Sequence, residues 1–160
     1  MAWTAPKTWA VGDVLTASDL NTYNRDNLTA LQPQQATVST QQTTTATSYT
    51  DLATVGPAVT LTTGTSVLVD IGAFMTNTGS AGIAASSMAV AVSGATTVAA
   101  PASQVYCAIG ATGNNPSFKV SYTGLVTGLT AGSNTFTAKY QVSAGTGTFA
   151  ERCIVVTACF

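Results

Sequence analysis

Most of the chain after residue 57 consists of short segments in which apolar and polar residues alternate, separated by Gly, Asn, Ser or Pro. A period of two places successive side chains on opposite faces of a strand, so one face of each segment is expected to be buried. Short strands at this spacing are typical of an antiparallel β-sandwich. The segments predicted to be strands are 58–63, 66–75, 87–94, 104–110, 117–126, 134–143 and 151–160.

The same alternation predicts which side chains form the core of the sandwich. The tyrosines at positions 49, 106, 122 and 140 alternate in the way that core residues do, so Tyr49, Tyr106, Tyr122 and Tyr140 are expected to be buried. The other residues predicted to lie on buried faces are Val67, Val69, Ile71, Ala73, Met75, Met88, Val90, Val92, Phe118, Val120, Phe136, Ala138 and Val142.

The last segment departs from this pattern, because both of its faces are largely apolar. One face carries Arg152, Ile154, Val156, Ala158 and Phe160. An antiparallel strand that is apolar on both faces indicates a second partner surface. We assign one face to the sandwich core and the other to a subunit interface, and the reverse assignment of the two faces stays open. The predicted interface residues are Cys153, Val155 and Thr157.

Residues 1–33 are predicted to be a separate anchoring arm and helix, followed by a sandwich domain over residues 34–160. The first part holds both tryptophans and a large share of the few charged residues. Thr16 followed by Asp19 is a capping-box start signal, and Pro33 ends the helical pattern. A helix of about fifteen residues is marginal alone, so it must pack on the sandwich, on its symmetry mates or on a host structure. The predicted anchor residues are Trp3, Trp9, Leu20, Tyr23, Leu28 and Leu31.

The segment 34–47 is rich in Thr and Gln and nearly uncharged. Such a composition is compatible with a flexible linker. Because its residues continue into Tyr49 and Leu52 with strand-like character throughout, a Thr-rich edge strand is the favoured interpretation.

The composition narrows the range of functions. Charged residues make up 7% of the chain, against about 25% in an ordinary soluble domain, and the net charge is −1. Five scattered basic residues form no patch for phosphates, so nucleic acid is not an expected partner. A net charge near zero favours self-association instead. The chain has neither an apolar run long enough for a membrane span nor the apolar core of a secretory signal, so we expect no membrane insertion and assembly in a cytoplasm.

The sequence contains little catalytic chemistry. Histidine is absent, which removes the commonest general base and transition-metal ligand. Asp70 and Glu151 are expected to be solvated, as is Arg152, although a strand-end ion pair with a neighbouring subunit is an alternative for the last two. The cysteines lack metal-ligand spacing and are expected to be small buried residues. We therefore predict no enzymatic activity, catalytic residue, metal or cofactor. The cysteines are Cys107, Cys153 and Cys159.

Two passages resemble small virion proteins of tailed bacteriophages, especially those of actinobacterial hosts. They are the opening MAWTAPKTWAVGDVLTASDLNTYNRDNLTAL and the runs TSYTDLATVGPAVTLTTGTSVLVDI and GLVTGLTAGSNTFTAKYQVSAGTGTFAERCIVV. The resemblance implies a trimeric jelly-roll domain in the virion, attached by its N-terminal segment, and similar proteins are usually labelled minor tail proteins. One departure is the C-terminal Ala158-Cys159-Phe160, where similar domains close on proline and leucine.

These features are compatible with three functions. The first is a homotrimeric tail-associated or fibre-like protein, bound to other virion proteins and with the host cell surface as a further partner. The second is a decoration or cement protein of the capsid. The third is a secreted carbohydrate-binding or hydrolytic β-sandwich. It is the least supported, because no secretory signal is expected and because sugar platforms expose several aromatic residues, whereas the tyrosines here are expected to be buried.

Overall fold

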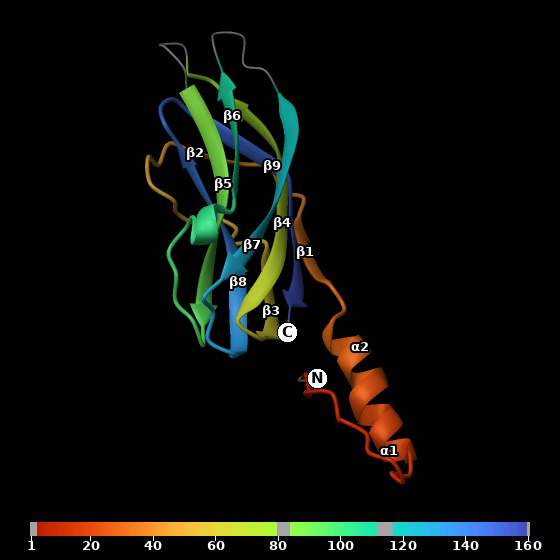
Figure 1. Cartoon of the computed structure of the whole chain (residues 1–160). Coiled ribbons are helices and arrows are strands. Elements are labelled where there is room, and N and C mark those ends of the chain that lie inside the picture. The colour runs from red at the N-terminus through yellow and green to blue at the C-terminus, as the bar shows by residue number, and fades with distance from the viewer. Residues whose placement is uncertain (1–2, 80–83, 112–116, 160) are drawn as a thin grey trace.

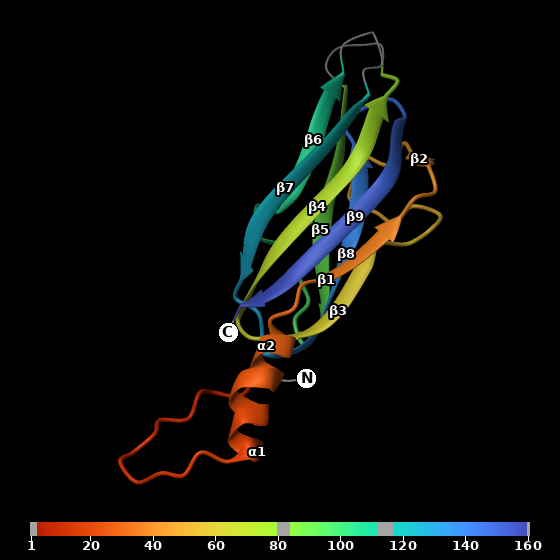
Figure 2. The same ribbon diagram turned by 90° about the vertical axis from the view of Figure 1, so that its right-hand side faces the viewer.

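The computed structural model describes residues 3–79, 84–111 and 117–159 of the chain. Two antiparallel sheets pack face to face, and a helical N-terminal module extends from one end of this sandwich (Figures 1 and 2). The module contains α1 (Ala17–Leu20), the π-helical segment η1 (Asn21–Asp26) and α2 (Asn27–Ala30), which follow one another without interruption. The expected arm, helix and antiparallel sandwich are thus confirmed.

Each sheet takes strands from several parts of the chain, as in a jelly roll. The five-stranded sheet has the order β1-β9-β4-β7, with β2 also pairing with β9, and the four-stranded sheet has the order β3-β8-β5-β6. The first sheet contains β1 (Gln34–Val38), β2 (Gln42–Thr44), β4 (Ser66–Asn77), β7 (Phe118–Thr127) and β9 (Gly147–Cys159). The second contains β3 (Ala58–Thr63), β5 (Ala84–Gly94), β6 (Tyr106–Ala111) and β8 (Gly132–Val142), and the short helix η2 (Ala102–Gln104) precedes β6.

The Thr-rich segment after the helix forms strands rather than a linker. β1 and β2 both pair antiparallel with β9, with Gln35 opposite Val155 and Thr43 opposite Thr148. The favoured edge-strand interpretation is therefore confirmed. Its threonines suit the half-exposed edge of a sheet, where a β-branched side chain fits the pleat and its hydroxyl still reaches water.

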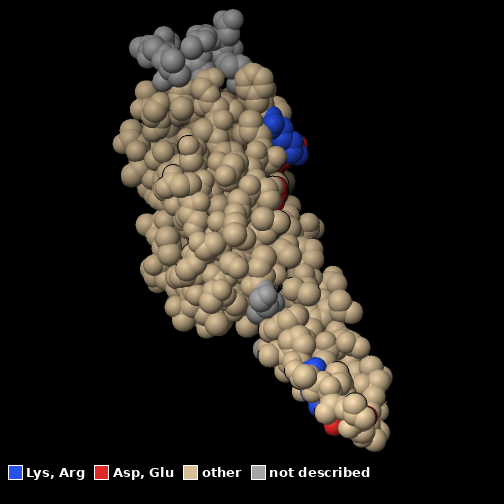
Figure 3. Space-filling view, viewed as in Figure 1, with Lys and Arg blue, Asp and Glu red and all other residues tan. Residues whose placement is uncertain are grey.

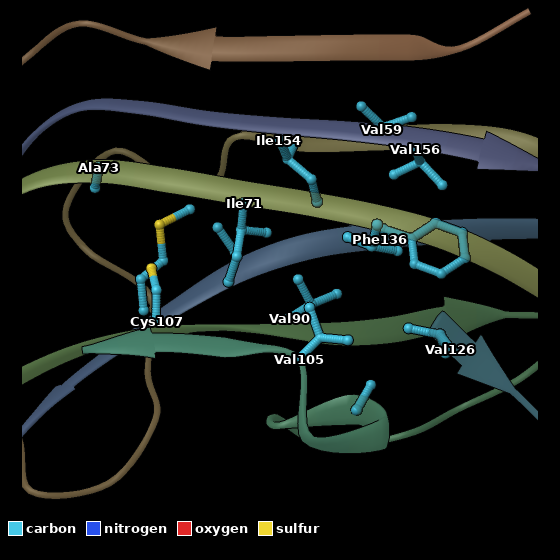
Figure 4. Close-up of a cluster of buried hydrophobic side chains, with 14 of the residues drawn as sticks. Val59, Ile71, Ala73, Val90, Val105, Cys107, Val126, Phe136, Ile154 and Val156 are labelled. Atoms are coloured by element: carbon cyan, nitrogen blue, oxygen red, sulfur yellow. The ribbon is translucent and has the colours of Figure 1, made fainter. Parts of the chain in front are cut away.

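The core lies between the two sheets, and most of the residues predicted for it are there. In Figure 4, Ile71 and Ile154 of the five-stranded sheet point toward Val90 and Phe136 of the four-stranded sheet. All five apolar residues of the predicted buried face of β4, from Val67 to Met75, are fully buried. Alternation in the sequence thus identified the inward faces of the central strands.

Three aromatic residues predicted for the core are instead exposed. Phe118 and Tyr122 lie on β7, and Tyr106 lies on β6. β7 is the last strand of its sheet, so within the described part of the chain no strand covers the outer edge along which Phe118 and Tyr122 lie. Tyr106 instead alternates with the buried Cys107, so it faces away from the core and its predicted face is wrong. Tyr122 does sit opposite the buried Ile71, on the inward side of the sheet, but at its margin. Alternation therefore predicted its face correctly and its burial wrongly.

A bulge in β9 changes which residues of this strand face inward. The pairing of β9 with β4 shifts register between Gly72 and Phe74, and Glu151 adopts the left-handed conformation with φ of 47°. The extra residue lets both Phe149 and Arg152 point into the core, although strict alternation would place them on opposite faces.

Candidate functional site

Strand β9 separates its two apolar faces clearly. Ile154 and Val156 are fully buried, whereas Cys153, Val155 and Thr157 are half-buried on the opposite face. The three residues predicted for a subunit interface therefore all lie on the outward side of the five-stranded sheet. The core assignment of the other face is confirmed, and the interface itself stays a prediction.

Strands β4 and β7 continue this outward face with large apolar side chains. Leu68 pairs with Thr157 on one side and with Leu125 on the other, so the three share one face. Leu68 is 43% exposed, Leu125 is 51% exposed and Phe74 is 39% exposed. We call this surface the outer patch; it consists of Leu68, Phe74, Leu125, Cys153, Val155 and Thr157.

Sequence reasoning did not assign Leu68, Phe74 and Leu125 to the interface. Two of these residues could have been identified from the sequence, because apolar residues also occupy positions of β4 that alternate with its buried residues. Leu68 and Phe74 both occupy positions where a solvated sheet face normally carries polar residues.

Few charges interrupt the outer patch. Asp70 lies within it, opposite Val155, and its carboxylate accepts a hydrogen bond from the hydroxyl of Thr123 on β7. At one end of the face, the ammonium of Lys119 lies 3.1 Å from a carboxylate oxygen of Glu151. Figure 3 shows charged side chains on only small areas of one view, at an edge of the sandwich and on the N-terminal module.

The N-terminal arm folds back along the helix. Asn27, which is buried, accepts a hydrogen bond of 2.9 Å from the Thr4 N–H and donates one of 2.8 Å to the Thr4 carbonyl. The Lys7 ammonium lies 4.2 Å from the centre of the Trp9 ring and 3.8 Å from a carboxylate oxygen of Asp19. The arm therefore covers one side of the helix.

The helix starts as predicted, but its apolar stripe is divided. Thr16 is the N-cap, and the capping box with Asp19 is present. The π-helical segment winds more residues into each turn than the 3.6 of an α-helix, so the α-helical spacing that predicted one continuous stripe does not hold across residues 21–26. Of the predicted anchor residues, Trp3 and Tyr23 are half-buried, whereas Trp9, Leu20, Leu28 and Leu31 are exposed.

Arg152 is fully buried, so its predicted solvation is wrong. Its guanidinium donates to the carbonyls of Thr40, Thr54 and Gly56 at 3.2 to 3.3 Å and to the Gln42 side chain at 3.4 Å. Its Nε lacks a hydrogen-bond partner within the described residues. The side chain thus holds β9 against the loops that precede β2 and β3.

The cysteines occupy two different environments. Cys107 is buried as expected, and burial, followed by the charge of Cys153, raises its pKa to about 12. Cys153 and Cys159 are only half-buried on the outward face, which contradicts their predicted burial. Burial also raises the pKa of Cys153. Among residues 3–79, 84–111 and 117–159, no group of three or more His, Cys, Asp or Glu side chains is placed to hold a metal ion.

Two hollows lie away from the outer patch. One, of about 410 Å³, is lined by polar residues at the junction of the helix and β3, including Gln32, Gln34 and Thr60. The other, of about 280 Å³, lies beside β5 and β8 and includes Val98 and Lys139. Lys139 is held there by a 2.7 Å ion pair with Asp51.

No protein-family model matches the chain, and no curated protein matches it with significance. Within the described part of the chain, no helix has the length and apolar character needed to span a membrane.

Proposed function

We propose that this protein is a non-enzymatic structural component of a bacteriophage virion that works as a homotrimer. In this proposal it is a tail-associated, fibre-like protein that assembles in the host cytoplasm. The N-terminal module attaches it to other virion proteins, and the sandwich is presented outward. The observation that carries the proposal is the outer patch, a nearly uncharged apolar sheet face.

The outer patch favours self-association on energetic grounds. Fully burying a Leu, Val or Phe side chain stabilises a protein by about 1.5–3 kcal/mol. In the isolated chain part of this free energy is missing for four side chains that stay exposed or half-buried, which are Leu68, Phe74, Leu125 and Val155. Cyclic symmetry covers the same patch on every copy at once. Net charge of −1 gives little electrostatic repulsion between copies.

The N-terminal module supports the attachment role. Val11, Val14 and Leu15, at the turn of the arm, are strongly exposed, and Trp9 is exposed beside them. They belong to the loop before α1, drawn in red in Figure 2, which forms the end of the module that lies farthest from the sandwich. Exposed apolar groups on a projecting element are typical of a protein-binding site.

Copy number in purified phage particles tests the virion role and separates its two versions. Quantitative mass spectrometry should find a few trimers per particle if the protein belongs to the tail. Hundreds of copies would instead support the alternative of a capsid decoration protein. Absence of the chain from purified particles would contradict both.

A carbohydrate-binding function is a second candidate, because two aromatic side chains expected in the core lie on the surface instead. Tyr106 and Tyr122, predicted to be buried, are both more than 40% exposed. Exposed aromatic rings are the surfaces on which sugars stack. A glycan array probed with the purified chain tests this: binding that is lost in Tyr106→Ala or Tyr122→Ala would favour it, and no binding would exclude it.

A further inference from the structure

We infer that the N-terminal helix is a second self-association element, in which the exposed apolar side of the helix packs against the same helix of neighbouring copies. This inference rests on the proposed trimer and adds a partner for the helix. The side chains that carry it are Leu20, Leu28 and Leu31, all of which are exposed.

The connection between the helix and the five-stranded sheet provides the geometric argument. β1 begins at Gln34, which pairs with Val156 of β9, the strand that bears the centre of the outer patch. Neighbouring strands lie about 4.8 Å apart. Leu31 is only three residues before Gln34, or at most about 10 Å of extended chain. Contacts between copies through β9 therefore bring the ends of their helices close together.

The direction of the helix agrees with this position. Figures 1 and 2 show the helix continuing from β1 on the side of the sandwich formed by the five-stranded sheet. Copies whose outer patches meet around an axis therefore also direct their helices along that axis. A cyclic assembly brings the same side of each helix to the centre.

The surface of the helix fits a second copy. The arm occupies the side that carries Asn27 and leaves the leucines uncovered. Leu20 and Leu28 are eight residues apart, whereas two α-helical turns hold about seven, so the wider π turns bring these two leucines closer to one line. Such a line is the seam along which helices associate.

Electrostatics does not oppose the contact. Both cations of the module are paired within the same copy: Lys7 lies 3.8 Å from Asp19, and Arg25 lies 2.9 Å from Asp26. The remaining carboxylate, Asp13, accepts a hydrogen bond of 3.0 Å from the Ala10 N–H. Both cations are therefore compensated within one copy, and of the three carboxylates of the module only Asp13 has no ion pair among the described residues.

Two substitutions in the first helical turn test the inference with matched chemistry. Leu20 and Ser18 are both exposed and lie two residues apart, on nearly opposite sides of the helix. Light scattering over a range of concentrations, on the full chain, should show that Leu20→Asp raises the concentration at which the trimer dissociates at least about ten-fold, the effect of about 1.4 kcal/mol. Ser18→Asp should leave that concentration unchanged.

Disulfide crosslinking between copies gives a second test, which reports how close the helices lie and does not depend on the stability of the trimer. Under mild oxidation Leu20→Cys should give new disulfide-linked pairs relative to the unmodified chain, and Ser18→Cys should not.

The combined results separate the helix inference from the sheet proposal. If Leu20→Asp and Leu20→Cys both behave like their Ser18 controls while Val155→Asp still gives monomers, the helix inference is wrong and the sheet proposal stands. If only Leu20→Asp dissociates the trimer, the helix inference stands and the sheet proposal fails. A wild-type chain that is monomeric throughout overturns both.

Discussion

The guanidinium carbon of Arg152 lies 5.3 Å from the centre of the Tyr140 ring, and both side chains donate to the carbonyl oxygen of Gly56. Tyr140 in turn makes an edge contact with Phe149, with ring centres 4.9 Å apart. This cluster joins β8 and β9, which belong to different sheets, to the loop before β3. A single buried cation therefore organises one side of the sandwich.

Replacing Arg152 with Ala is expected to destabilise the domain strongly. The substitution leaves the buried carbonyl of Gly56 and the partly buried carbonyls of Thr40 and Thr54 with fewer donors, and each unsatisfied buried polar group costs about 1–3 kcal/mol. Urea unfolding should show a loss of about 3 kcal/mol or more. Lys119→Ala, which removes an exposed ion pair, is the control and should cost less than about 1 kcal/mol. Equal losses for the two variants would contradict the role given to Arg152.

Stability is expected to fall in alkaline solution. Burial raises the pKa of Cys107 from 9.0 to about 12 and also raises the pKa of Tyr140. Between these values the unfolded chain releases the Cys107 proton while the folded chain retains it. The contribution of the protonated Cys107 thiol to the free energy of unfolding is therefore fully present below pH 9 and is lost as the pH rises toward the pKa of the folded state. The loss is at most about 1.4 kcal/mol per pH unit for each such group.

Unfolding free energies measured between pH 8 and about 11 check this dependence. Cys107→Ala should have a shallower slope above pH 9, because it lacks the ionisable group. A slope that is the same in the variant and the wild type would show that Cys107 does not contribute.

The hydrogen bonds of Asn27 are expected to hold the arm on the helix. Asn27→Ala removes both bonds to Thr4 and one to the Tyr23 carbonyl. Trypsin should then cleave after Lys7 at least about ten-fold faster, since each bond contributes about 0.5–1.5 kcal/mol. Asn24→Ala, at an exposed position of the same helix, is the matched control. Unchanged cleavage in Asn27→Ala would mean that the arm is held by other contacts.

The tip of the arm is expected to be needed for attachment but not for trimer formation. Val11 is fully exposed there, so Val11→Asp should not disturb the fold. Incorporation of this variant into phage particles should fall, whereas its mass in solution should equal that of the wild type. Thr8→Asp, also on the exposed arm, serves as the control. Normal incorporation of Val11→Asp would place the anchor elsewhere.

Local patterns predicted much of the fold, because alternation and capping depend on neighbours in the sequence. The bounds of β3 and the capping box of Thr16 followed directly from such patterns. Burial at sheet margins did not, since Tyr122 faces inward but stays exposed on β7, the last strand of its sheet. Strand order is a long-range property that alternation does not contain.

The buried position of Arg152 also lay beyond local patterns. Its acceptors, Thr40, Thr54 and Gly56, lie about a hundred residues earlier in the chain, and the bulge at Glu151 decides the direction of its side chain. For the candidate site, the two-faced apolarity of β9 was visible in the sequence. The contribution of Leu125 required the register of β4 and β7, which places this residue opposite Leu68.

The central claim, self-association through the outer patch, is tested most directly by the mass of the protein in solution. Wild type should scatter light as a trimer at micromolar concentration. Val155→Asp and Leu125→Asp should be folded monomers with unchanged β-type circular dichroism, because both side chains face outward. Gln141→Asp, on the outward face of the other sheet, should remain trimeric, and Val156→Asp should unfold because Val156 is fully buried. A monomeric wild type, or trimers in both Val155→Asp and Leu125→Asp, would contradict the claim.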